Sequence, residues 1–196
     1  MSATSSPYGF QPISSQSGII RPLRIPFGVA SGYGTSLYKY QPVQLNASTG
    51  LLQALPAGNS PIFGIFAGME YTPLGGRPAE SPFWPSGTVY DPSYDTFAYV
   101  WPAWMPDTRF KAQSIGSVPQ NSLGAQFNVA NGTAGSNYSG ISSSGVSLAL
   151  TSGVQGQFSL IEFATDITSS IGDAYTDLIL TITNPQVGLG IQTGIG

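Results

Sequence analysis

The stretch Ile62-Phe63-Gly64-Ile65-Phe66-Ala67-Gly68 is a short apolar run that contains two glycines. Short apolar runs rich in β-branched and aromatic residues are typical of buried strands. A glycine inside a strand often marks a place where another backbone approaches closely. We therefore expect a buried β-strand here, with a close backbone neighbour.

Further strand patterns lie on both sides of this run. Residues 41–55 contain alternating apolar and polar residues around the turn Asn46-Ala-Ser-Thr-Gly50, which predicts a hairpin. Because no window carries an apolar stripe with a period of 3.6 residues, we predict an all-β fold. The architecture expected is a small antiparallel β-sandwich or barrel-like domain. The other strands are expected at residues 96–101, 146–151, 158–163 and 178–183.

Prolines set the first part of the chain apart. Of the 16 prolines, only Pro185 lies beyond Pro119. Four of them fall in the first 30 residues, where they exclude a helix and hinder sheet pairing. We interpret residues 1–35 as an extended N-terminal arm that carries exposed apolar anchors. Such an arm either folds back over its own domain or docks on another subunit, and we favour docking.

The remainder, residues 36–196, is predicted to form the β domain. Residues 72–95 contain five prolines and are expected to be a loop-rich insert. Residues 128–145 are rich in Gly, Ser and Asn, which predicts an exposed loop.

The composition excludes several kinds of chemistry. The chain contains no Cys and no His, so it has no disulfide, no thiolate or imidazole metal ligand and no Ser-His-Asp triad. Charged residues make up 8% of the chain, against about 25% in a typical globular domain. A surface with so little charge is poorly protected against association, which indicates a protein that works inside an assembly. The 6 basic residues do not make the basic stripe that nucleic-acid binding requires.

Carboxylates are the remaining candidates for catalysis or metal binding. A glycosidase needs two carboxyl groups about 5–10 Å apart, but acids beside Pro and Ser are more often turn residues. Calcium would need oxygen ligands, and the available spacing is not that of an EF-hand loop. We predict no enzyme activity, no metal and no cofactor. The pairs considered are Asp91 with Asp95, Glu70 with Glu80, and Asp173 with Asp177.

The candidate contact residues are apolar or basic residues of the arm and aromatic residues of the segment 83–104. For the aromatic cluster, three interpretations stay open: core packing, a subunit interface, or a platform on which a sugar stacks. Its members are Phe83, Trp84, Tyr94, Tyr99, Trp101 and Trp104. The candidates are Tyr8, Phe10, Ile13, Ile19, Ile20, Arg21, Leu23, Arg24, Phe27, Phe83, Trp84, Trp101 and Trp104.

The N-terminal sequence shows neither the basic region nor the apolar region of a signal peptide. No run approaches the roughly 20 apolar residues of a membrane helix. We expect a soluble protein made in the cytoplasm, without a membrane or small-molecule partner. The sequons at Asn46, Asn131 and Asn137 are interpreted as turn asparagines.

Several short motifs, read in order, resemble the head decoration (cement or auxiliary capsid) proteins of tailed double-stranded DNA bacteriophages. The similarity spans roughly residues 6–186, and one departure is Gln41, where such hairpins often carry an aspartate before Pro-Val. The order of the motifs carries more weight than any one of them. They are Ser6-Pro-Tyr-Gly-Phe-Gln-Pro12, Tyr40-Gln-Pro-Val-Gln-Leu45, Ile62 to Tyr71, Phe83-Trp-Pro-Ser-Gly87, Phe97 to Pro106, Thr108 to Gln113, Ser122-Leu-Gly124, Ser139-Gly-Ile-Ser142, Gly156 to Ile161, Gly172 to Asp177 and Ile182-Thr-Asn-Pro185.

The resemblance implies an all-β virion protein on the outer surface of an icosahedral capsid. It also implies that the partner is the major capsid protein and that the protein itself is a homotrimer, made in the cytoplasm of a bacterial host. Two other functions stay open. One is a glycan- or receptor-binding β-sandwich of a phage fibre, using Trp84, Trp101 and Trp104, and the other is a tail or neck component.

Overall fold

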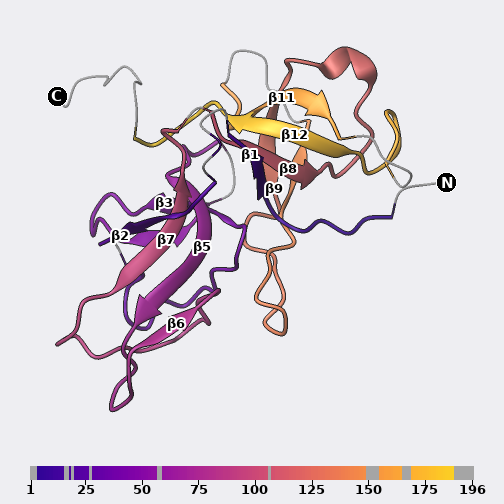
Figure 1. The fold of residues 1–196 in the computed structure, drawn as a ribbon. Helices are drawn as coiled ribbons and strands as arrows, with labels where there is room; N and C mark the ends of the chain where they lie inside the picture. Colours follow the sequence, from indigo (N-terminus) through magenta and orange to yellow (C-terminus); the bar gives the residue numbers. More distant parts are fainter. Residues whose placement is uncertain are drawn as a thin grey trace.

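The described part of the chain forms two antiparallel sheets and one short 3-10 helix. Figure 1 shows how they are arranged. The structure, a computed structural model, describes residues 4–15, 18, 20–26, 28–56, 59–105, 107–148, 155–164 and 169–187. The first sheet has the order β1-β8-β12-β11-β9-β10. Its strands are β1 (Gln11–Ser14), β8 (Arg109–Gln113), β9 (Gln126–Ala130), β10 (Gly145–Ser147), β11 (Phe158–Phe163) and β12 (Asp177–Ile182).

The second sheet has the order β2-β7-β5-β3-β4, and β6 pairs with β5 beyond this path. The helix η1 (Gln120–Ser122) precedes β9. The predicted all-β class is confirmed. The strands of the second sheet are β2 (Leu23–Ile25), β3 (Pro42–Leu45), β4 (Leu52–Ala54), β5 (Gly64–Tyr71), β6 (Ala79–Ser81) and β7 (Phe97–Pro102).

Strand β5 begins within the apolar run, contains both of its glycines, and is buried on both faces there. Ile65 packs into a core cluster shared with the first sheet, whereas Phe66 belongs to a second cluster on the opposite face. A Cβ atom on Gly64 would lie 2.7 Å from the carbonyl oxygen of Trp101, and one on Gly68 would lie 2.8 Å from that of Ser81. The predicted close backbone approach is therefore confirmed. Burial on both faces explains why this strand is continuously apolar rather than alternating.

The predicted hairpin at residues 41–55 is also confirmed, as β3 and β4. The Oδ1 atom of Asn46 accepts hydrogen bonds from the backbone N–H groups of Ser48 (2.9 Å) and Thr49 (3.2 Å). Gly50 has a φ of 70°, which an L-residue with a side chain rarely adopts. This Asx turn fixes the register of the hairpin.

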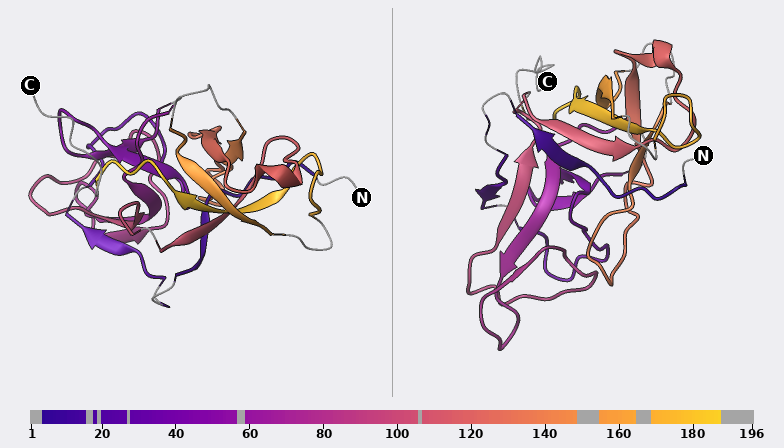
Figure 2. Two further views of the ribbon diagram at one scale, coloured as in Figure 1. Left: turned by 90° about the horizontal axis from the view of Figure 1, so that it is seen from above. Right: turned by 45° about the vertical axis from the view of Figure 1, so that its right-hand side comes forward.

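The two sheets meet where β5 begins and β7 ends, and they cross at an angle (Figures 1 and 2). Phe10, Ile65, Trp101, Phe110 and Phe158 are buried in the shared cluster. The far face of the second sheet is covered by loops, which add buried side chains such as Leu37 and Trp84. Each core therefore depends on residues far apart in the sequence.

The first sheet curls toward a barrel. Ser114, which follows β8, forms a parallel bridge with Val146 of β10. The backbone N–H of Ile115 donates to the carbonyl of Val146 at 2.7 Å. Through this bond the edge strand β10 lies next to the end of β8, although the two strands are far apart in the order of the sheet.

The prolines of residues 1–35 are expected to hinder sheet pairing, but the segment contributes two strands. Strand β1 pairs with β8, placing Pro12 opposite Phe110, and β2 pairs with β7. Both are edge strands, where only one side needs its backbone groups and proline is tolerated. Whether the segment also docks on another subunit stays a prediction.

The two segments interpreted as loops also contain strand residues and buried side chains. Residues 72–95 include β6 and the fully buried Trp84. The segment 128–145 includes the end of β9, and Ser142 and Ser144 within it are buried. Their hydroxyl groups are hydrogen-bonded to one another at 2.8 Å, so a polar sequence fills an interior position here. The strand expected at 146–151 is found as β10, and residues 149–151 lie outside the described ones.

Candidate interaction surface

Three of the candidate contact residues are interior side chains. Phe10 and Trp84 are completely buried, and Trp101 is 8% exposed. The ring of Phe10 stacks on Phe158, with 4.5 Å between centroids and an interplanar angle of 11°. Because these rings pack within the chain, they are core residues and do not offer a face to a partner or to a sugar.

Four more candidates are half-buried. Phe83 stacks on Tyr38, and Trp104 packs edge-on against Phe63. Ile20 packs against the shared core cluster. Tyr8 is half-buried next to Gly9. The predicted aromatic cluster is therefore mainly a packing unit, and this excludes Trp84 and Trp101 from a glycan platform.

The exposed candidates lie on the edge strands and between them. Ile13 of β1 is 40% exposed and Leu23 of β2 is 37% exposed. Arg21 and Arg24 are also exposed. Ile19 and Phe27 lie outside the described residues. The structure thus leaves apolar side chains at the free edges of both sheets.

Arg24 lies in a polar cluster at the surface, formed with residues of β5 and β7. Its Nε donates to Oε2 of Glu70 at 3.1 Å, and its Nη2 donates to Oε1 at 3.2 Å. The guanidinium carbon lies 3.3 Å from the ring centroid of Phe97. The hydroxyl of Tyr99 donates to Glu70 at 3.2 Å. Arg24 is therefore held by a bidentate ion pair and a cation–π contact.

This cluster shifts the pKa values of its members. The hydrogen bond from Arg24 lowers the pKa of Glu70, and the same bond raises the pKa of Arg24. Burial raises the pKa of Tyr99, and Glu70 adds to that effect. Glu80, considered with Glu70 as a carboxylate pair, lies directly opposite it on β6. The Arg24 guanidinium is bound to Glu70, so this carboxylate stays ionised and is unsuited to the role of a general acid.

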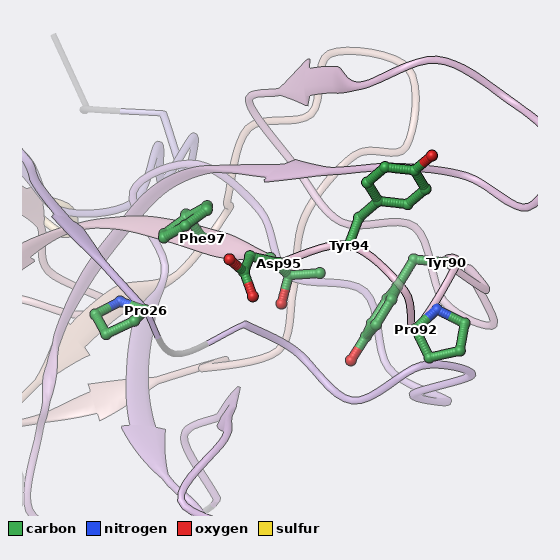
Figure 3. Close-up of a pocket in the computed structure, with 7 residues that line it drawn as sticks. Pro26, Tyr90, Pro92, Tyr94, Asp95 and Phe97 are labelled. Atoms are coloured by element: carbon green, nitrogen blue, oxygen red, sulfur yellow. The ribbon is translucent and has the colours of Figure 1, made fainter.

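A pocket of about 370 Å³ opens at the end of the same sheet, between the end of β2 and the start of β7. In Figure 3 the Asp95 carboxylate is seen between the rings of Phe97 and Tyr90, while the ring of Tyr94 is turned away from Tyr90. Tyr94 is 56% exposed. The lining residues are Pro26, Tyr90, Pro92, Tyr94, Asp95, Thr96 and Phe97.

Sequence reasoning placed Tyr94 in an aromatic cluster and Asp95 in a carboxylate pair, but it did not identify this pocket. Asp91, the other member of that pair, uses its Oδ1 to accept from the backbone N–H of Ser93 at 2.9 Å. Asp91 is thus the turn residue that the sequence predicted. The available signal for the pocket was the sequence Tyr90-Asp-Pro-Ser-Tyr-Asp-Thr-Phe97, in which aromatic residues and acids recur within a proline-containing loop.

A second exposed feature is the turn that carries Tyr138, whose side chain is fully exposed. The turn is closed by a hydrogen bond from the N–H of Gly140 to the carbonyl of Ser136 at 2.8 Å. Tyr38 fixes its base by donating its hydroxyl to Asn137 at 2.8 Å. Figure 1 shows this part of the chain as an orange loop beside the second sheet.

The candidate calcium ligands do not come together as a metal site. Asp177 of β12 is mostly buried and forms an ion pair with Lys111 at 2.8 Å. Asp173 instead accepts from the backbone N–H of Ser170. Within the described residues, no group of three or more acidic side chains is placed to hold a metal ion.

Comparison with protein families, with curated proteins and with solved structures finds no match for this chain. In the described part of the chain, no helix is long and apolar enough to cross a membrane.

Proposed function

We propose that this chain is a non-enzymatic structural protein of a phage virion. It binds the outer surface of the icosahedral head and clamps neighbouring major capsid proteins, as the ordered sequence motifs of residues 6–186 imply. One structural observation supports the proposal most strongly. A single N-terminal segment supplies an edge strand to each sheet and exposes Ile13 at one edge and Leu23 at the other.

The edges themselves suit contacts through side chains rather than strand addition. Pro12 lies within β1, and Pro22 and Pro26 flank β2. A proline has no backbone N–H to donate, so these edges resist pairing with a strand of another protein. Burial of apolar side chains on a partner contributes about 25 cal/mol per Å² before ordering costs. Those costs are reduced here because the strands are already fixed by pairing within the chain.

Repetition over a shell strengthens such contacts. Each exposed side chain offers little area, but copies held together as a homotrimer would bind at several points at once, which raises the effective concentration of each contact. The low charge of the chain removes a barrier to such close association.

The test is binding to shells assembled from the major capsid protein of the same phage without this chain. We compare the wild type with the double variant Ile13→Ser/Leu23→Ser and with a matched control, Leu123→Ser. Leu123 is 54% exposed and lies just after η1, outside the strands of both sheets. Occupancy is measured by sedimentation of the loaded shells and by electron cryomicroscopy.

The double variant is expected to lose most of its occupancy, while Leu123→Ser keeps it. Circular dichroism confirms that each variant retains its β structure. Absence of wild-type binding would overturn the proposal, and equal occupancy of both variants would overturn the edge contacts. The number of copies per virion separates shell decoration from a tail or neck component, since only decoration repeats over the whole shell.

A further inference from the structure

The pocket at the start of β7 combines aromatic rings with a carboxylate. Tyr90, Tyr94 and Phe97 line it, and Asp95 adds a negative charge. None of the described residues that line the pocket is basic. Within the described part of the chain, no hydrogen bond or ion pair engages the Asp95 carboxylate, which is exposed. The pocket thus presents an unneutralised charge beside ring surfaces.

The adjacent Arg24 cluster shows which kind of group binds between an aromatic ring and a carboxylate. Arg24 places its guanidinium 3.3 Å from the ring centroid of Phe97 and pairs with Glu70 through two nitrogens. Phe97 belongs to both sites, because it also lines the pocket. The same sheet edge therefore holds one ring-and-carboxylate site that is filled by a guanidinium and a second that is open.

The ring arrangement narrows the choice of ligand. A sugar requires a flat ring face beside its hydroxyl-binding groups, and the two tyrosine rings diverge instead of forming a common platform (Figure 3). A cation needs only ring surface within about 6 Å and a nearby carboxylate. A guanidinium suits such a site, because it stacks on rings and is more weakly hydrated than an ammonium.

We propose that this pocket binds an arginine side chain presented by a partner protein, with Asp95 as the counter-ion and Tyr90 as a ring contact. The proposal goes beyond capsid decoration, since it holds for any partner that presents an arginine at this site. Its test uses no shells, so its failure and that of the proposed function are distinguishable.

The probe is N-acetyl-arginine methylamide, added to the full-length ¹⁵N-labelled protein and followed by NMR. N-acetyl-citrulline methylamide serves as the neutral probe of nearly the same shape. A single side chain at an open site is expected to bind with a Kd of about 1–50 mM. The arginine probe should shift the amide signals of residues 90–97 and bind about fivefold more tightly than the citrulline probe.

Two variants test whether the Asp95 carboxylate is the group that binds the charged probe. Asp95→Asn keeps the shape and should reduce the affinity for the arginine probe to that for the citrulline probe. Glu80→Gln removes an exposed carboxylate that does not line the pocket, and it should leave the affinity unchanged. Unchanged signals outside the pocket show that both variants are folded.

Three results would overturn the proposal: equal affinity for the two probes, unaltered binding by Asp95→Asn, or no shift in residues 90–97 at about 50 mM probe. Shifts confined to the signals of Glu70 and Arg24 would also overturn it, because the probe would then compete at the filled site.

Discussion

The N-terminal segment has two parts with opposite character. Residues 4–10 are anchored: the N–H of Gly9 donates to Ser144 at 3.1 Å, that of Phe10 donates to Tyr40 at 2.9 Å, and the Phe10 ring is completely buried. Residues 21–24 lie at the surface, with Leu23 and two arginines exposed. A deletion of the first 27 residues would remove a core ring together with the candidate contacts. Stability and binding are therefore separable only by single substitutions.

The largest effect is expected at the anchored part. Phe10→Ala should lower the free energy of unfolding by about 3–5 kcal/mol, because it leaves a cavity against Phe158. Urea denaturation followed by circular dichroism measures the loss. Phe10→Leu, which keeps most of the volume, should cost clearly less. A loss below about 1 kcal/mol for the alanine variant would show that the ring is not a core anchor.

The next prediction separates two reasons why a position requires glycine, namely a positive φ and a lack of room for a Cβ atom. Gly9 has a φ of 78°, and a Cβ there would lie 2.6 Å from the carbonyl oxygen of Tyr40. Gly18 has a similar φ of 72°, but a Cβ would meet nothing within 4 Å. Gly9→Ala should therefore destabilise the protein by about 2–4 kcal/mol and Gly18→Ala by about 1 kcal/mol, both measured by thermal denaturation. Equal costs at the two positions would show that packing against Tyr40 contributes nothing.

A smaller, pH-dependent effect is expected in the surface part. Because Arg24 lowers the pKa of Glu70 in the folded state, their contact stabilises the protein above the unfolded pKa of a glutamate, about 4.3. That contribution is lost as the pH falls through the lowered, folded pKa. The stability difference between the wild type and Arg24→Gln should be largest near neutral pH and should vanish in acid.

Denaturation midpoints measured across this pH range test the expectation. The carboxyl signal of Glu70, followed by NMR, should titrate at a higher pH in Arg24→Gln than in the wild type. A stability difference that grows as the pH falls would contradict the assigned sign.

The smallest effect on stability is expected at Leu23. Its side chain is exposed and its backbone pairing with Val100 does not depend on the side chain. Leu23→Ser should change the free energy of unfolding by no more than about 0.5 kcal/mol. A larger loss would mean that Leu23 packs within the chain like Phe10, and the contrast between the two parts would fail.

The sequence predicted local structure well where a strand is defined by its own residues. The run at 62–68 and the Asn46–Gly50 turn carry their own signals, namely apolar burial, glycine and an Asx turn. It did not identify the two strands among the prolines of the first 30 residues, because proline excludes a central strand but is compatible with an edge strand. A local pattern does not reveal whether a strand pairs with another strand on one side or on both sides.

The candidate surface was less predictable. Phe10 and Leu23 are both apolar residues near prolines, but one is completely buried and the other is 37% exposed. Trp84 is interior because Tyr71 and Tyr90 pack edge-on against it, which depends on how the segment that follows β6 folds against β5. The pocket beside Asp95 forms only because the end of β2 is brought next to the start of β7.

The sequence by itself determined that the chain is all-β, poor in charge and without thiol or imidazole chemistry, since composition and short-range periodicity suffice for these conclusions. The tertiary structure alone decided which aromatic residues form the core and which charges are paired. It also placed the N-terminal segment at an edge of each sheet. These outcomes depend on pairing between residues such as Arg24 and Glu70, 46 positions apart, and the energy of a contact depends on distance in space rather than along the chain.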